Sequence, residues 1–328
     1  MNYKILVQYD GTRYEGWQRQ ERTESTIQGK IEAVLSKMCG EEVQIQGAGR
    51  TDAGVHAKEQ VANVHLKEQV DPQEVKQYLN RYLPEDIAVS EVREVPERFH
   101  SRLNATGKIY VYRIATGEVK KVFERRYIYD FGEKPDMELM CRAAEILTGT
   151  HDFKSFCNVH TQVEDTVRTI YDLEVEKEEE LITIRVRGNG FLYNMVRIIA
   201  GTLVKIGMGV YPPEKMEEIL EEKNRAAAGP TIPARGLTLV SLEYEKELAP
   251  YLEGENKHWH YVLDQRNVPE KGLAYLTIER CEPEELDGVL RRVIHQAYRN
   301  GAKQVFVRDT FGEEGSLSLI HISEPTRH

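Results

Sequence analysis

The alternation of apolar and polar residues predicts a β-α-β-β-α-β series in the first hundred residues. Each helix begins at a capping signal: Ser25 with Gln28 three positions later forms a capping box, and Asp71 precedes Pro72. Gly40 ends the first helix and Leu83 ends the second. The strands are expected at residues 4–10, 42–48, 59–66 and 87–95.

The same order returns more loosely in the second hundred residues. Strands are expected at residues 108–115, 170–176, 181–187 and 237–245, and helices at residues 136–147, 191–206 and 213–222. Two successive units of this kind predict an α+β fold, in which two ferredoxin-like βαββαβ halves form one joined antiparallel sheet with helices packed on it. The helix at 191–206 is apolar on nearly every face and should be buried, while Arg197 and Lys205 argue against a membrane span.

The pattern changes after Leu248. Two strands, a helix and a further strand follow within about 60 residues, which is marginal for an independent core. We therefore divide the chain into an N-terminal half (1–105), a C-terminal half (106–248), an extension (249–315) and a tail (316–328). The tail, SLSLIHISEPTRH, has the character of an artefact, and we expect no function from it.

Composition predicts a soluble, globular, cytoplasmic protein. Hydrophobic residues make up 40% of the 328 and charged residues 30%, and no apolar run approaches the roughly 20 residues of a membrane span. The net charge of -10 argues against indiscriminate nucleic-acid binding, yet residues 98–117 and 181–213 each carry four basic residues and no acid. These segments are either solvated faces or the walls of a cationic groove suited to a polyanion.

Several common sites are excluded. The four cysteines lack the spacings of a disulfide framework or a zinc site, so we expect reduced thiols. The glycine-rich segment 47–57 does not match a nucleotide-binding motif, because Asp52 occupies the third glycine position and no GK[ST] follows. Asp52 and His56 alone are too few ligands for a metal ion.

The segment 47–57, GAGRTDAGVHA, places one carboxylate in a tight loop. Arg50 lies two residues before Asp52, and the small residues around them would let a flat ligand approach the backbone. One interpretation is a structural turn with a local ion pair. The other is a site in which a carboxylate, held ionised by an arginine, acts as nucleophile or general base.

This segment resembles the signature of the tRNA pseudouridine synthase A family, and the resemblance covers about residues 3–248. Further matching stretches are YDGTRYEGWQRQ, TIQGKIEAVL, LPEDIAV, FHSRLNATGKIYVYRI, NMVRIIAG and GLTLVSLEY. The resemblance implies isomerisation of uridine to pseudouridine at positions 38, 39 and 40 of the tRNA anticodon stem-loop, with no metal or organic cofactor. It also implies a homodimer in which one tRNA contacts both subunits.

The resemblance further implies roles for four residues. Asp52 matches the catalytic aspartate and Arg50 the arginine that pairs with it. Tyr110 matches the tyrosine that lies against the target base, and Arg197 matches a position near the aspartate in the second half. An ionised Asp52 would add to uracil C6, attack ribose C1′ or remove a proton from C2′, and the sequence leaves the three open.

The target uridines lie in or beside a stem, so the base must leave its stack at a cost of a few kcal/mol. Phosphate contacts made by the two basic segments would offset that cost, and Arg102 and Arg187 are candidates for such tRNA contacts. Tyr110 would supply an aromatic face and a hydroxyl; its alternative is an ordinary core tyrosine.

Two other functions stay open on the sequence. A noncatalytic tRNA-binding or folding protein would share the fold but would not need a carboxylate facing phosphate-rich RNA. A bifunctional protein would place separate chemistry after residue 250, where the extension resembles the beginning of an acyltransferase-type domain. His258 and His260 lack further nearby ligands, and we expect them to be surface residues.

Overall fold

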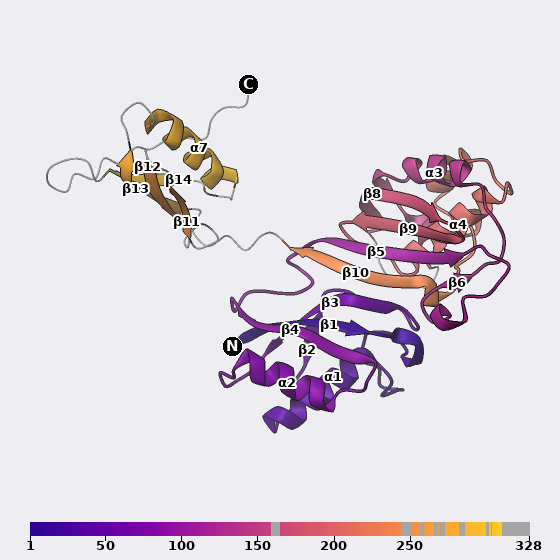
Figure 1. The fold of residues 1–328 in the computed structure, drawn as a ribbon, viewed down its shortest axis with the longest axis horizontal. Coiled ribbons are helices and arrows are strands. Elements are labelled where there is room, and N and C mark those ends of the chain that lie inside the picture. Colours follow the sequence, from indigo (N-terminus) through magenta and orange to yellow (C-terminus); the bar gives the residue numbers. More distant parts are fainter. Residues whose placement is uncertain are drawn as a thin grey trace. The chain divides into compact units, whose positions relative to one another are not determined.

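The structure is a computed structural model of the chain. It describes residues 1–158, 165–244, 251–255, 259–265, 268, 273–281, 286–299, 302 and 304–309. The chain divides into two compact units, Met1–Tyr244 and Glu245–His328, each of which is described by itself (Figure 1).

The N-terminal half of the first unit confirms the predicted β-α-β-β-α-β series. Its elements are β1 (Asn2–Tyr9), the 3-10 helix η1 (Gly11–Arg13), α1 (Ile27–Cys39), β2 (Ile45–Gly47), β3 (His56–His65), α2 (Pro72–Tyr82) and β4 (Ile87–Val95). The expectation that Ser25 caps α1 is wrong by one residue. Thr26 is the N-cap and accepts the Gly29 amide hydrogen, whereas the Ser25 carbonyl is held in the preceding loop by the Glu15 amide.

The C-terminal half repeats the series with additions. Its elements are β5 (Ala105–Ala115), β6 (Tyr129–Asp130), α3 (Met137–Ile146), β7 (Gly149–Asp152), β8 (Val167–Glu178), β9 (Leu181–Gly188), α4 (Met195–Gly207), α5 (Lys215–Glu222) and β10 (Leu237–Tyr244). Four further 3-10 turns are η2 (Val122–Glu124), η3 (Lys154–Phe156), η4 (Arg225–Ala227) and η5 (Ala234–Gly236). The predicted start of α4 at Phe191 is wrong, because Asn194 adopts a left-handed conformation (φ 63°) and the helix begins after it.

The two halves form one sheet with the strand order β4-β1-β3-β10-β5-β9-β8-β7 (Figure 1). They join where β10 lies parallel to β3, with His56 opposite Thr238 and Ala57 opposite Leu239. Every other main-path pairing is antiparallel. The last strand of the unit in sequence therefore lies near the middle of its sheet.

One face of this sheet is buried across both halves, and the helices pack on that face. Leu239 on β10, Tyr110 on β5 and Val186 on β9 lie opposite one another on that face, and all three are buried. Helix α4 crosses the core as predicted: 11 of its 13 residues are buried, and the two exceptions are Arg197 and Lys205. This packing leaves the N-terminal end of α4 beside the middle of the sheet.

The second unit contains β11 (Tyr251–Glu255), β12 (Trp259–Asp264), β13 (Leu273–Cys281), α7 (Leu286–Arg299) and β14 (Gln304–Asp309). Strand β11 was not predicted; it adds to the expected β, β, α, β order and forms a sheet in the order β11-β12-β13-β14. Its core includes Leu276 and Val289. The 316–328 tail and His258 lie outside the described residues. None of the helices that the structure describes is long and apolar enough to cross a membrane.

We expect a chain that ends after Leu248 to unfold like the full chain, because every strand and helix of the first unit is kept together with its own core. Thermal unfolding of the two chains should give midpoints within about 3 °C, equivalent to about 1 kcal/mol for a unit of this size. A larger fall in the midpoint would show that the extension stabilises the first unit.

Candidate active site

The loop between β2 and β3 holds Asp52 in a tight turn. The Val55 amide donates a hydrogen bond to the Asp52 carbonyl (3.1 Å), and Gly54 takes a positive φ of 78°. A second segment lies behind this turn. There the Trp17 amide donates to the Thr51 carbonyl (3.0 Å) and the Gly54 amide donates to the Tyr14 carbonyl (3.2 Å).

The two segments approach so closely that glycine is required. Gly16 has a φ of 96°, and a Cβ atom there would lie 2.7 Å from the Thr51 carbonyl oxygen. A Cβ atom on Gly47 would lie 2.3 Å from Nε1 of Trp17. Trp17 is only 1% exposed, so its side chain is part of the core that supports the turn.

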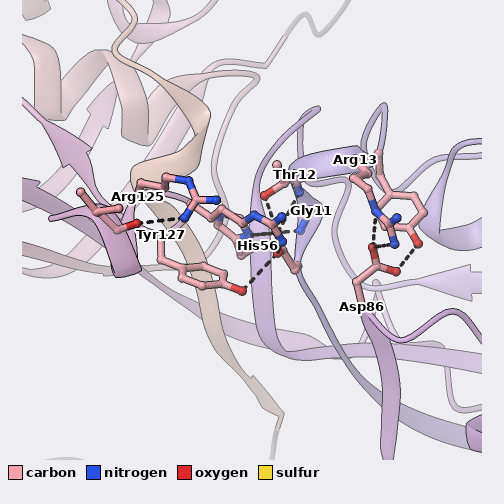
Figure 2. A network of polar contacts seen from close by, with 11 residues as sticks. Gly11, Thr12, Arg13, His56, Asp86, Arg125 and Tyr127 are labelled. Atoms are coloured by element: carbon pink, nitrogen blue, oxygen red, sulfur yellow. Dashed lines mark hydrogen bonds and ion pairs between the residues drawn. The ribbon is translucent and has the colours of Figure 1, made fainter. Parts of the chain in front are cut away.

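A polar network fixes the start of the segment that contains Tyr14 and Trp17 and lies against the Asp52 turn (Figure 2). Nδ1 of His56 accepts the Gly11 amide hydrogen (3.1 Å) and lies 3.2 Å from the Asp10 carboxylate. The Tyr127 hydroxyl donates to the other Asp10 oxygen (3.1 Å). Burial lowers the pKa of His56, which favours the neutral ring, and a neutral ring can accept the Gly11 amide hydrogen at Nδ1.

Asp52 forms an ion pair with Arg197, which comes from the first turn of α4 in the other half. Nη1 of Arg197 lies 3.4 Å from Oδ2 of Asp52, and the two side chains are only 17% and 14% exposed. Arg197 is itself held by the Ile232 carbonyl (2.8 Å) and the Asn194 side chain (3.0 Å). Burial raises the pKa of Asp52 above its usual value, and Arg197 offsets part of this rise.

Asp52 lines a cavity of about 340 Å³, within the range of small-ligand sites. Tyr110, 8% exposed, lies on the buried face of β5 and meets Phe191 edge-to-face, with ring centroids 5.3 Å apart. Burial raises the pKa of Tyr110, with smaller contributions from Tyr9 and Asp52. The Tyr110 phenol therefore stays protonated.

The rest of the cavity wall is basic. Arg50, Arg102, Lys108 and Arg168 all line it, and Asp52 is its acidic residue. A larger cavity of about 820 Å³ lies on the other face of the sheet and is lined partly by acids, including Asp86 and Glu124. The smaller cavity suits an anionic ligand better, since its single carboxylate is already paired with Arg197.

The structure brings together five of the six residues predicted for the site. Asp52, Tyr110, Arg50 and Arg102 line the cavity, and Arg197 contacts Asp52. The expected ion pair between Arg50 and Asp52 is not formed. Arg50 is exposed and makes no ion pair with any residue that the structure describes, and the cation that lies beside the carboxylate is Arg197.

Arg187 is not brought to the cavity. On β9 it follows Val186, which faces Tyr110, so strand alternation directs Arg187 to the opposite face of the sheet. There its guanidinium pairs with Glu243 (2.8 Å) and Asp172 (3.4 Å). The basic segment 181–213 is thus partly neutralised by acids on β8 and β10.

Two basic residues of the cavity were not named individually for the site: Lys108 was predicted only as part of the basic segment 98–117, and Arg168 was not predicted. Lys108 lies two positions before Tyr110 in a predicted strand, so the period of two was a signal for its place on the same face. Arg168 carried no such signal, because its position depends on how β8 pairs with its neighbours. Among the described residues, no group of three or more His, Cys, Asp or Glu side chains is placed to hold a metal ion.

Comparison with known proteins gives consistent matches. A family model described as tRNA pseudouridine synthase matches residues 5–104 and 143–245. A tRNA pseudouridine synthase A of Bacillus sp. (strain KSM-64) is 49% identical over 243 residues, which cover 74% of this chain and 99% of the relative. A tRNA pseudouridine synthase A 1 of Clostridium tetani (strain Massachusetts / E88) is 46% identical with the same coverage. The solved structure of an H/ACA RNP bound to a substrate RNA containing 2′-deoxyuridine matches at 13% identity and a TM-score of 0.32, covering 74% of this chain and 49% of that chain.

The turn around Asp52 yields a stability prediction. Gly16→Ala should lower the free energy of unfolding by about 3 kcal/mol, because the new Cβ meets the Thr51 carbonyl at a positive φ. Gly40→Ala is the matched control. Gly40 has a φ of 70° with nothing near its Cβ position, so its cost should be about 1 kcal/mol. Urea unfolding measures both, and equal costs would contradict the close approach.

Proposed function

Since the chain belongs to the tRNA pseudouridine synthase A family, we propose that it isomerises uridine at positions 38, 39 and 40 of the tRNA anticodon stem-loop, with Asp52 as the catalytic carboxylate. The family's reaction is the isomerisation of uridine in tRNA. The positions within the tRNA and the residue roles are our proposal, as is the cytoplasm as the place of the reaction.

The observation that carries this proposal is the largely buried Asp52–Arg197 pair at the wall of a cavity. Burial disfavours the charged form of a carboxylate in such a place, and Arg197 lowers the pKa of Asp52 and so favours the ionised form. A simple surface turn would leave such a pair in water, where it contributes little to stability, whereas here the two side chains are only 17% and 14% exposed. The arrangement fits a reactive carboxylate.

The cavity can hold the uracil while it is detached from the ribose. Tyr110 and Phe191 offer apolar ring surface, and the neutral phenol of Tyr110 can donate a hydrogen bond. The glycosidic bond from N1 to C1′ breaks, the base turns, and a bond forms from C5 to C1′. The C5 proton then leaves and N1 gains a proton, so no other reactant is consumed.

Asp52 has three possible tasks in this sequence, which the proposal keeps open: addition to uracil C6, attack on ribose C1′, or removal of the C2′ proton. All three require the ionised form. We assign the binding of the RNA to the basic residues of the cavity, with the exposed Arg50 at its rim and Arg102 beside it. Arg187 would contact RNA only on the other face of the sheet.

The family resemblance also leads us to propose a homodimer in which one tRNA contacts both subunits. In that arrangement the fold of each subunit supplies a complete Asp52–Arg197 pair, since the two residues belong to the same chain. The dimer would extend the RNA-binding surface and would leave the chemistry of each cavity unchanged.

Replacing Asp52 with Asn tests the proposal directly. Size is nearly kept and the amide oxygen can still accept a hydrogen bond from Arg197, so the variant should fold. It should bind tRNA with little change in affinity, because phosphate contacts dominate binding. The single-turnover rate of pseudouridine formation should fall by at least about a thousandfold. It is measured at saturating enzyme on an unmodified tRNA transcript, with mapping of the labelled sites.

Glu176→Gln is the matched control, since Glu176 is an exposed carboxylate on β8 and its loss should leave the rate unchanged. If Asp52→Asn kept more than about a tenth of the wild-type rate, Asp52 would not be the catalytic carboxylate. If the wild-type protein bound tRNA but formed no pseudouridine, a noncatalytic binding protein would replace the enzyme.

The ion pair predicts a pH dependence. The rate should fall as the pH drops through the raised pKa of Asp52, because protonation removes the reactive carboxylate. Arg197→Met removes the cation that lowers this pKa, so the acid limb of the single-turnover profile should move to higher pH. Arg197→Lys keeps a positive charge and should move the limb less. If the acid limb of Arg197→Met did not move, the group that titrates in the rate profile would not be Asp52.

A further inference from the structure

One wall of the Asp52 cavity gathers three basic side chains, and among the described residues only the exposed Asp165, 3.9 Å from Arg168, pairs with any of them. Lys108 projects from β5 and donates a hydrogen bond to the Ala48 carbonyl (2.9 Å). Arg102, from the loop before β5, and Arg168, on β8, line the same wall. The three side chains thus come from separate parts of the chain and meet at one place.

Their lack of counter-charges sets them apart from other basic residues of the same sheet. Among the described residues, neither Lys108 nor Arg102 forms an ion pair, and Arg168 has only an exposed Asp165 at 3.9 Å. On the opposite face, Arg185 lies 2.7 Å from Asp172 and Arg187 lies 2.8 Å from Glu243. Gathering cations without partners costs free energy, and a bound anion removes that cost.

The electrostatics of Lys108 agree with this view. Burial, followed by repulsion from Arg102 and Arg168, lowers the pKa of Lys108 to about 8. A lysine that only supported the fold would be better served by a carboxylate than by two arginines. An anion in the cavity would reverse the effect and hold Lys108 in its charged form.

The spacing along β5 indicates which anion fits. Lys108 and Tyr110 lie on the same face of the strand. They are two positions apart, which is a rise of roughly 6.6 Å along the strand. A base placed against Tyr110 therefore has its own sugar-phosphate backbone within reach of Lys108. Gly49 keeps the route open, because its Cβ position lies 3.6 Å from Nζ of Lys108 and holds no side chain.

We propose that Lys108, together with Arg102 and Arg168, binds a backbone phosphate next to the target uridine and so positions that nucleotide over Asp52. The inference rests on the proposed function and adds Lys108 and Arg168 to it as positioning residues. The phosphate is recognised as an anion through charge-assisted hydrogen bonds and not through any base.

A purely structural role is the competing explanation, because the bond from Lys108 to Ala48 also fixes the start of the Asp52 turn. The two explanations differ in what the RNA must supply. A structural lysine acts regardless of the charge on any one phosphate. A phosphate-binding lysine loses its effect when that phosphate becomes neutral.

The test is a double-substitution cycle on the full chain. One partner is Lys108→Met, and the other is a tRNA carrying a single neutral methylphosphonate on the 5′ or the 3′ side of the target uridine. Affinity is measured in an Asp52→Asn background, which prevents turnover. The single-turnover rate is measured in proteins that keep Asp52. One methylphosphonate should weaken binding to the parent about tenfold, and the same RNA should lose almost nothing further with Lys108→Met.

Lys177→Met is the matched control, because Lys177 is exposed on the same strand as Arg168 but nine residues along it. It should show the full methylphosphonate effect. Lys108→Met should also lower the slope of log affinity against log salt by about one. If both methylphosphonates weaken binding equally with and without Lys108, the proposal is overturned. Absence of pseudouridine with unmodified RNA would instead overturn the proposed function.

Lys108→Arg keeps the test decisive if the methionine variant fails to fold. Arginine keeps its charge, so the methylphosphonate should still weaken binding to Lys108→Arg. The affinity of this variant should no longer depend on pH between 7 and 9. Affinity of the lysine protein should fall as the pH rises from 7 to 9, because Lys108 loses its proton near pH 8. The other ionisable groups that face Lys108 across the cavity are unchanged in this variant: Arg50, Asp52, Arg102, Tyr110, Arg168 and Tyr193. Equal pH dependence in both proteins would contradict the proposal.

Discussion

The short parallel pairing of β3 with β10 is the constraint on which the candidate site depends. Two residue pairs join the halves into one sheet, and the loop that holds Asp52 ends where this pairing begins. The same junction brings α4 beside the loop, so that Asp52 meets Arg197, 145 residues away in sequence. Neither half on its own contains both members of the ion pair.

Burial acts in opposite directions on the two walls of the cavity. It raises the pKa of Asp52 and lowers that of Lys108, because in each case the charged form loses its hydration. The protein supplies a counter-charge for the carboxylate through Arg197, but it surrounds the lysine with further cations. The two walls therefore differ: the carboxylate of Asp52 is paired within the protein, whereas Lys108 has no acidic partner among the described residues.

The sequence predicted what is local and missed what depends on pairing between distant segments. Strand β4 was predicted to the residue, because alternation over residues 87–95 is a period-two signal that needs no partner. The predicted partner of Asp52 was wrong, since nearness in the chain favoured Arg50 whereas the fold supplies Arg197. Arg187 was counted with a basic segment, but strand alternation and the acids Asp172 on β8 and Glu243 on β10 decide its surroundings.

The central position of β10 in the sheet also has a consequence while the chain is being synthesised. Its residues 237–244 leave the ribosome long after β4 ends at Val95, by roughly 7 to 28 seconds at about 5–20 residues per second. During that interval the N-terminal end of β3 has no neighbouring strand on the side where β10 will pair, because β2 pairs only with residues 62–64 of β3. An open strand edge can pair with another chain. The nascent protein is thus exposed to misassembly until β10, the last strand of the first unit, pairs with β3.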